Sequence, residues 1–183
     1  SYEGIIEDYN NLLKGVQLWD VAVERQVQIK GPDAEALSQF LTPRNIKKCS
    51  KGQAMYAPFL DFKGGFINDP VMLKIDEDCY WFSLADGDAL LWAQAIAAGY
   101  KFDVDIHEPD VSPLQVQGPN SKELMIKVFG NWVNDLGFYR FKEVNHEGIS
   151  MVIARMGYSR ELCYEIFLQD NSKGDELWEI LWQ

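Results

Sequence analysis

The chain has 183 residues, of which 47% are hydrophobic and 13% are aromatic, enough for one large domain or two small ones with a substantial core. The formal net charge of −11 argues against a nucleic-acid-binding protein, which needs a basic face, and against binding to anionic membrane surfaces. The three cysteines have no CxxC spacing and the two histidines are far apart, which argues against a bound metal and against a Ser-His-Asp catalyst. No apolar run approaches the roughly 18 residues of a membrane span. We therefore expect a cytoplasmic protein with reduced thiols.

The first part of the chain predicts a helix, a strand and a second helix. Residues 3–13 have helical spacing, and residues 16–30 alternate between apolar and polar side chains, which is typical of one half-buried strand. Gly31, Pro32 and Asp33 then predict a turn into a helix over 34–41. Proline suits the start of a helix because its missing N–H is not needed there.

The next part of the chain predicts three short strands and a helix, over residues 54–62, 71–75, 80–84 and 86–98. An aspartate, either Asp86 or Asp88, is placed to cap this helix. The connections between the strands are short, which favours antiparallel pairing.

The segment 63–70, Lys-Gly-Gly-Phe-Ile-Asn-Asp-Pro, is a candidate binding element. Its two glycines let the backbone reverse and leave room for another molecule to approach. Asp69 precedes a proline, which holds the aspartate backbone extended. Two interpretations stay open at this point: a simple hairpin turn, or a carboxylate fixed beside a ligand-binding opening.

A strand, a Gly-Pro-Asx turn and a helix occur a second time. Residues 112–117 predict a strand, and Gly118, Pro119 and Asn120 lead into a helix that includes Leu124 and Phe129. Gly118 follows Gly31 by 87 residues. This offset indicates either an internal structural repeat, with a period longer than that of a solenoid, or two ordinary turns.

The remaining elements are strands and a final helix, over residues 138–144, 149–155, 164–168 and 175–183. The chain therefore predicts an α+β fold with mainly antiparallel sheets and packed helices. We expect two interleaved subdomains, one from residues 1–50 with 110–183 and one from the inserted residues 51–109. The apolar final helix lacks a cap, and we expect the chain to be a fragment whose C-terminal domain is absent.

Glu165 lies in the apolar strand between Tyr164 and Ile166. A carboxylate at a buried strand position needs a partner. Arg155 is one candidate. A ligand with adjacent N–H donors, such as the edge of a pterin, is the other, because a carboxylate accepts two parallel hydrogen bonds.

The order of the motifs resembles the folate-binding aminomethyltransferase family, which contains the glycine cleavage T-proteins and their relatives. The motifs that carry this resemblance are Leu18-Trp19-Asp20-Val21-Ala22, Gly31-Pro32-Asp33-Ala34, Tyr56, Gly64 to Asp69, Gln117-Gly118-Pro119 and Gly157 to Glu165. The resemblance implies the first two domains of a cloverleaf-like fold and tetrahydrofolate as the cofactor. It also implies that Asp69 is the catalytic residue beside the reactive N5/N10 edge, that Tyr56 packs on folate, and that Glu165 and Tyr158 bind the pterin.

Within the family, several phrases are similar to the dimethylsulfoniopropionate demethylases, and Asn68 and Leu84 depart from the T-protein pattern. We therefore predict methyl transfer from a small sulfonium or similarly methylated donor to N5 of tetrahydrofolate, with Asp69 able to accept the N5 proton. Trp132 is a candidate aromatic wall for the sulfonium cation, and its other interpretation is a core tryptophan at a helix end.

Three functions thus remain: the methyltransferase, an aminomethyltransferase that uses a lipoyl carrier protein, and a folate-binding protein without catalysis. The expected partner of the first is a small-molecule methyl donor, and an oligomer is compatible with each.

Overall fold

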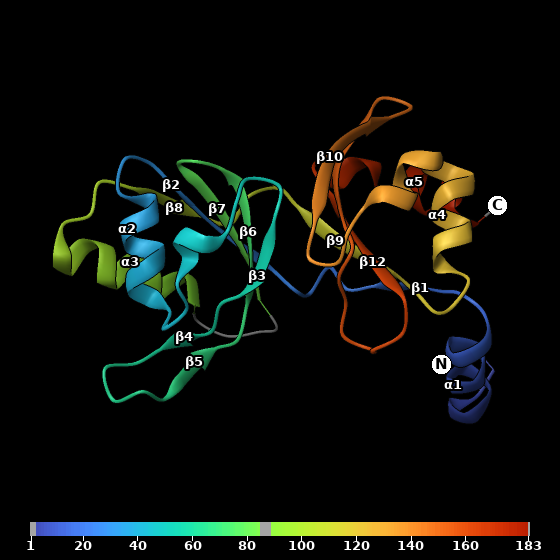
Figure 1. Cartoon of the computed structure of the whole chain (residues 1–183), viewed down its shortest axis with the longest axis horizontal. Coiled ribbons are helices and arrows are strands. Elements are labelled where there is room, and N and C mark those ends of the chain that lie inside the picture. Colours follow the sequence, from blue (N-terminus) through green and yellow to red (C-terminus); the bar gives the residue numbers. More distant parts are fainter. Residues whose placement is uncertain (1–2, 85–88, 183) are drawn as a thin grey trace. The chain divides into compact units, whose positions relative to one another are not determined.

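The computed structural model describes residues 3–84 and 89–182, and the chain divides into two compact units. Val23–Pro109 form one unit, called the insert unit below, and Ser1–Ala22 with Asp110–Gln183 form the other, called the flanking unit. Each unit contains an antiparallel five-stranded sheet with helices, so the predicted α+β class is confirmed (Figure 1). The insert unit begins at Val23 rather than at residue 51, because the strand that follows Val23 pairs within this unit.

The sheet of the insert unit has the order β3-β6-β7-β2-β8. Its strands are β2 (Gln26–Lys30), β3 (Ala54–Tyr56), β6 (Val71–Asp76), β7 (Cys79–Ser83) and β8 (Asp105–His107). Helices α2 (Ala34–Leu41) and α3 (Ala89–Tyr100) cover one face, a short 3-10 helix η1 (Ile46–Lys48) follows α2, and β4 (Phe59–Leu60) pairs with β5 (Phe66–Asn68) in a separate hairpin (Figure 1).

The core of the insert unit lies between its sheet and these helices. Val27 and Ile29 of β2 and Tyr80 and Phe82 of β7 are buried there, because successive strand residues point to opposite faces of a sheet. The residues between them, such as Gln28 and its pairing partner Trp81, therefore point to the face away from the helices. The helix expected over 86–98 is found as α3, and its expected caps, Asp86 and Asp88, lie outside the described residues.

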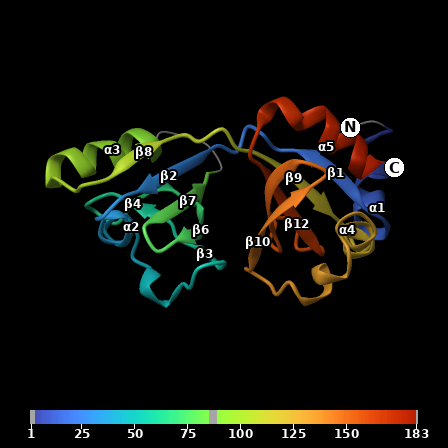
Figure 2. The same ribbon diagram turned by 90° about the horizontal axis from the view of Figure 1, so that it is seen from above.

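The sheet of the flanking unit has the order β1-β9-β12-β11-β10. Its strands are β1 (Gln17–Asp20), β9 (Ser112–Gln117), β10 (Phe141–His146), β11 (Ile149–Ala154) and β12 (Cys163–Leu168). The helical segments of this unit are α1 (Ile5–Lys14), α4 (Ser121–Phe129), α5 (Gly174–Trp182) and the 3-10 helices η2 (Asn131–Asp135) and η3 (Asn171–Lys173) (Figure 2). Tyr164 and Ile166 of β12 pack with Met125 of α4 and Leu177 of α5 in its core.

Two predicted strands are wrong in extent. Residues 16–30 are not one strand, because β1 and β2 belong to different sheets. A turn separates the two strands, and in it Asp20 Oδ1 accepts a hydrogen bond from the N–H of Ala22 at 3.0 Å. Residues 54–62 form β3 and then β4, because Pro58 between them lacks the N–H that a continuous ladder needs. Alternation continues through the first interruption and a mostly apolar run continues through the second, so the hydrophobic pattern alone does not reveal them.

The two sheets repeat the same strand pairing. Lys30 in β2 lies opposite Cys79 on one side and Asp105 on the other, and Gln117 in β9 lies opposite Cys163 and Gln17 in the same way. The structure therefore supports the internal repeat over two unrelated turns. The edge strands are exchanged: β1 precedes β2 in the sequence but pairs with β9, whereas β8 precedes β9 but pairs with β2.

The repeated Gly-Pro-Asx turns are fixed by the same hydrogen bonds. The N–H of Asp33 donates to the Asp103 carbonyl at 3.2 Å, and the N–H of Asn120 donates to the Gly15 carbonyl at 3.1 Å. Gly31 and Gly118 both have a positive φ, of 138° and 118°. A Cβ on Gly31 would meet the Asp103 carbonyl oxygen at 2.8 Å, and one on Gly118 would collide with the Gly15 carbonyl oxygen, so both turns require glycine.

Candidate functional site

The sheet of the flanking unit carries a polar face on the side away from its core helices. The residues that define this polar face are Trp19, Gln115, Gln117, Cys163 and Glu165, which lie opposite one another in the strand register. Their neighbours in sequence, such as Val116 and Tyr164, point into the helix-covered core. The alternation of β9 and β12 therefore assembles an amide and carboxylate cluster from strands that are far apart in the sequence.

Glu165 is the carboxylate of this cluster, and only 7% of it is exposed. Its Oε1 accepts a hydrogen bond from Gln115 Nε2 at 2.9 Å, and Gln115 Oε1 in turn accepts one from Gln117 Nε2. Burial of a carboxylate is costly unless donors compensate for the lost water. Sequence reasoning weighed Arg155 as the partner, whereas the Nη1 of Arg155 donates to the Leu136 carbonyl at 3.4 Å.

Cys163 shares the polar face with Glu165 and is 6% exposed. Burial raises the pKa of its thiol to about 11, the negative charges of Glu165 and Glu161 add to this rise, and Arg155 opposes it. A thiol with this pKa stays protonated near neutral pH, and it is the thiolate that acts as nucleophile. Cys163 is therefore a packing residue.

The insert unit carries a second chain of polar contacts on its sheet face away from the helices. Trp81 Nε1 donates to Gln28 Oε1 at 2.9 Å, and Gln28 Nε2 lies 3.4 Å from His107 Nε2. His107 Nδ1 lies 2.8 Å from Asp105 Oδ2. When Nδ1–H donates to Asp105, Nε2 is the acceptor for the Gln28 amide. Gln28 in β2 lies opposite Trp81, whereas Gln115 in β9 lies opposite Glu165. The two glutamines thus hold equivalent positions, and the neighbour of Gln28 is an indole instead of a carboxylate.

Tyr56 and Asp69 lie at the same end of neighbouring strands. Tyr56 ends β3 and pairs with Val71, and the N–H of Ala57 donates to the Pro70 carbonyl at 2.9 Å. Tyr56 is 38% exposed and Asp69 is exposed, whereas Asn68 before it is buried. The register thus places these two predicted residues at one end of the β3–β6 pair.

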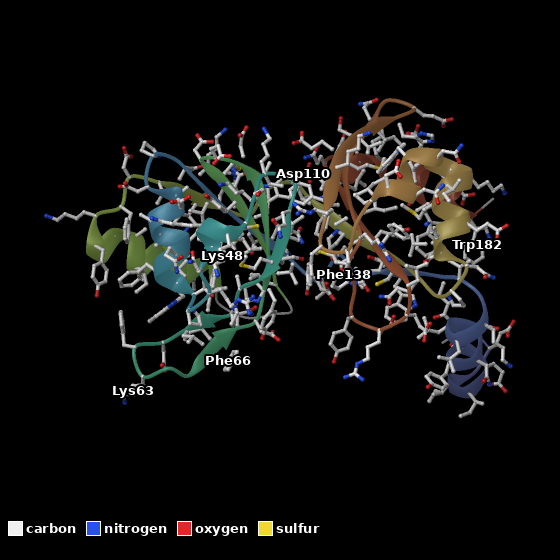
Figure 3. The ribbon with its side chains drawn as sticks, in the orientation of Figure 1. Lys48, Lys63, Phe66, Asp110, Phe138 and Trp182 are labelled. Atoms are coloured by element: carbon white, nitrogen blue, oxygen red, sulfur yellow. The ribbon has the colours of Figure 1, made fainter. Side chains whose placement is uncertain are left out.

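The glycine turn belongs to the β4–β5 hairpin, on which Lys63 and Phe66 are marked in Figure 3. Asp61 Oδ1 accepts hydrogen bonds from the N–H of Lys63 at 2.8 Å and of Gly65 at 2.7 Å. The carboxylate of Asp61 therefore closes the turn, a role that sequence reasoning missed. The signal was an aspartate two residues before the turn, which is typical of an Asx-turn.

The structure favours the second interpretation of Trp132, a tryptophan that packs at a helix end. Its ring packs against the helix-side core of the flanking unit, and its Nε1 donates to the Phe129 carbonyl at 2.8 Å. The Lys142 ammonium lies 4.7 Å from the ring centroid, so a cation already occupies that face.

Tyr158 is 90% exposed in the loop between β11 and β12, and Leu84 is buried after β7.

Among the residues that the structure describes, no group of three or more His, Cys, Asp or Glu side chains is arranged to hold a metal ion. Across those same residues, no helix has both the length and the apolar character to span a membrane.

Comparison with known proteins identifies the relatives of the chain. Residues 1–183 match the GCVT N-terminal domain. Dimethylsulfoniopropionate demethylase DmdA from Ruegeria pomeroyi is 44% identical over 98% of this chain and 50% of that protein. An aminomethyltransferase from Chlorobium limicola is 31% identical over 99% of this chain and 51% of that protein. The chain spans about half the length of these two relatives.

Similarity to a solved structure agrees with these matches. The crystal structure of glycine cleavage system aminomethyltransferase T from Bartonella henselae superposes with a TM-score of 0.87 and 21% identity, over 97% of this chain and 48% of that one. This likeness confirms the predicted fold, and the family model confirms the predicted resemblance. The chain belongs to the GCVT N-terminal domain family.

Proposed function

We propose that the protein containing this chain transfers a methyl group from a small sulfonium or similarly methylated compound to N5 of tetrahydrofolate. The observation that carries the proposal is its 44% identity to a dimethylsulfoniopropionate demethylase, against 31% to the aminomethyltransferase compared above. Asn68, which stands where the family resemblance leads us to expect an aspartate, agrees with this choice.

The carboxylate of Glu165 fits the pterin part of tetrahydrofolate. A pterin presents adjacent N–H donors along one edge, and an ionised carboxylate accepts two such donors in parallel. Gln115 donates to one oxygen of Glu165 at 2.9 Å and thereby orients the carboxylate plane. We assign to Glu165 the binding of the pterin edge. We keep Tyr158, on the same motif, as a second pterin contact that needs its loop to close, because its side chain is 90% exposed.

Tyr56 and Asp69 fit the remaining roles that the family resemblance implies. The exposed tyrosine offers a ring on which a folate ring can pack. Asp69, which is exposed near the same end of the β3–β6 pair, serves as the proton acceptor for the N5 proton. When bound, tetrahydrofolate supplies the nucleophilic N5, while the neutral thioether leaves with the electrons of the broken S–C bond. Positioning is then the main task of the protein.

Aminomethyl transfer from a lipoyl carrier protein is the second candidate, because the aminomethyltransferase from Chlorobium limicola is 31% identical to this chain. A folate-binding protein without catalysis is the third. Asp69→Ala in the full-length protein distinguishes the third from the others, since loss of this carboxylate should impair an enzyme but not the cellular function of a binding protein.

The direct test supplies the full-length protein with dimethylsulfoniopropionate and tetrahydrofolate and measures 5-methyltetrahydrofolate and methylthiopropionate. Equal amounts of both products support the proposal. Ammonia release that depends on a lipoyl carrier, without methyl transfer, supports the second candidate. Folate binding with neither reaction supports the third. This chain by itself is expected to bind folate weakly, and submicromolar affinity in calorimetry would contradict that expectation.

A further inference from the structure

Two glutamines on β9 form a directional chain of hydrogen bonds that ends at Glu165. Gln117 Nε2 donates to Gln115 Oε1, and Gln115 Nε2 donates to Glu165 Oε1 at 2.9 Å. Gln117 is fully buried and Gln115 is 3% exposed, so neither amide is a solvated surface group. The side-chain N–H groups of both glutamines donate in the direction of the carboxylate, which is the direction that stabilises an ionised acid.

The internal repeat provides a comparison within the same molecule. Gln28 occupies the position of Gln115 in the other sheet, and its neighbour on the next strand is Trp81 instead of Glu165. There the amide has the opposite direction, because its oxygen accepts the indole N–H at 2.9 Å. The direction of the glutamine therefore follows the chemistry of its partner, and Gln115 is directed as a carboxylate requires.

From this we infer that Gln115, oriented by Gln117, is a positioning residue that holds Glu165 ionised and in a single orientation for a ligand with two adjacent N–H donors. The inference rests on the proposed function, in which that ligand is the pterin of a folate. A carboxylate has about four acceptor positions on its two oxygens, so the Gln115 contact does not exhaust its capacity to accept a ligand.

Among the described residues, the ionisable groups near Glu165 include Cys163 on the polar face, whose thiol also responds to the charges of Glu161 and Arg155. Cys163 lies two residues away on β12, Glu161 precedes that strand, and Arg155 follows β11. The two β9 positions that face Glu165 and Cys163 are glutamines, Gln115 and Gln117, which do not titrate. These groups stay the same when Gln115 is replaced, so a change in the pH dependence of ligand binding reports on the Gln115 contact.

The test uses the full-length protein and 5-methyltetrahydrofolate as the probe, with affinity measured by calorimetry from mildly acidic to mildly alkaline pH. Gln115→Met keeps the length of the side chain and removes the donor. We expect it to weaken binding roughly tenfold, which corresponds to about 1.4 kcal/mol. We also expect the loss of binding on acidification to occur at higher pH, because a buried carboxylate without its donor gains a proton more readily.

Gln28→Met is the matched control, because it makes the same change at the equivalent position of the other sheet, and it should leave the midpoint of the acidic limb where it is in the wild type. Glu165→Gln should weaken binding and remove that limb. Gln115→Met added to Glu165→Gln should then cost little more, since a residue that acts through Glu165 has no effect once the carboxylate is gone. Gln115→Asn, whose shorter amide falls short of Glu165, replaces Gln115→Met if the latter does not fold.

The outcomes separate the two claims. If Glu165→Gln binds the probe as the wild type does, the assignment of the pterin to Glu165 fails. If Glu165→Gln weakens binding while Gln115→Met and Gln115→Asn keep the affinity and the pH midpoint of the wild type, the positioning role of Gln115 is overturned and the proposed function stands.

Discussion

Gly31 and Gly118, which are 87 residues apart, occupy the same position in two copies of one strand-turn-helix unit. Each has a positive φ, and each is approached by the backbone that precedes an exchanged edge strand. The turn and the edge strand are therefore coupled, because the carbonyl that excludes a side chain also accepts the hydrogen bond of the Asx residue two positions later.

This coupling gives the first prediction. Gly118→Ala should lower the free energy of unfolding by about 1–3 kcal/mol, because alanine disfavours this φ and its Cβ would collide with the Gly15 carbonyl. Gly99→Ala is the control: Gly99 lies in α3 with no neighbour within 4 Å of an added Cβ, so alanine should stabilise the helix by about 0.5–1 kcal/mol. Urea unfolding measures both. Equal effects of the two substitutions would contradict the role of Gly118.

The second prediction concerns Gly157, which packs against the polar face. A Cβ at this position would lie 2.9 Å from Cys163 Cβ and 3.9 Å from Gln117 Cδ. Gly157→Ala should therefore destabilise the fold by about 1–3 kcal/mol, as overpacking generally does. The same change in a Cys163→Ala background should cost less, because the sulfur that the added methyl group meets is gone. A double-mutant cycle in urea unfolding checks this, and additive effects would show that the two residues do not meet.

The third prediction is the pH dependence of stability due to Cys163. The pKa of its thiol rises from 9.0 to about 11 on folding, chiefly through burial. Because the folded pKa lies above the unfolded one, the stabilising effect is complete below the unfolded pKa and is lost as pH rises through the interval between the two. Relative to Cys163→Ala, the wild type should lose about 2–3 kcal/mol of unfolding free energy over this interval. Parallel curves of unfolding free energy against pH for the wild type and Cys163→Ala would refute this prediction.

The fourth prediction separates packing from substrate binding at Trp132. Trp132→Phe removes the hydrogen bond to the Phe129 carbonyl and weakens the contact with the Lys142 ammonium. We expect a loss of about 1 kcal/mol in stability, with the KM for the methyl donor unchanged in the full-length protein. A large rise in KM without a change in melting temperature would restore Trp132 as a wall of the substrate site.

Local chemistry made part of the fold predictable from sequence. The Gly-Pro-Asx turns were found because their residues act on their own backbone, and the helix over Ala34–Leu41 has the expected bounds. The exchange of β1 and β8 was not predictable, because pairing between strands far apart in the sequence leaves no local signal. The single strand expected over residues 16–30 failed for the same reason, since alternation continues across the turn after Asp20.

The candidate site, too, was predictable from the sequence only in part. Glu165 was singled out because a carboxylate stands out in an apolar strand, whereas the partners weighed for it were Arg155 and a ligand, and Gln115 was missed. The missed signal was a pair of glutamines at alternate positions of β9, which points two amides to one face. Which strand lies opposite them depends on the sheet order, and the sequence does not reveal that order.

The most direct test of the central claim follows the methyl group itself. Dimethylsulfoniopropionate labelled with deuterium in its S-methyl groups is incubated with tetrahydrofolate and the full-length protein, and the folate products are analysed by mass spectrometry. The proposed function predicts 5-methyltetrahydrofolate that carries the whole labelled methyl group, with its formation strongly reduced by Glu165→Gln. Absence of label from tetrahydrofolate, with the wild-type protein folded and able to bind folate, would contradict it.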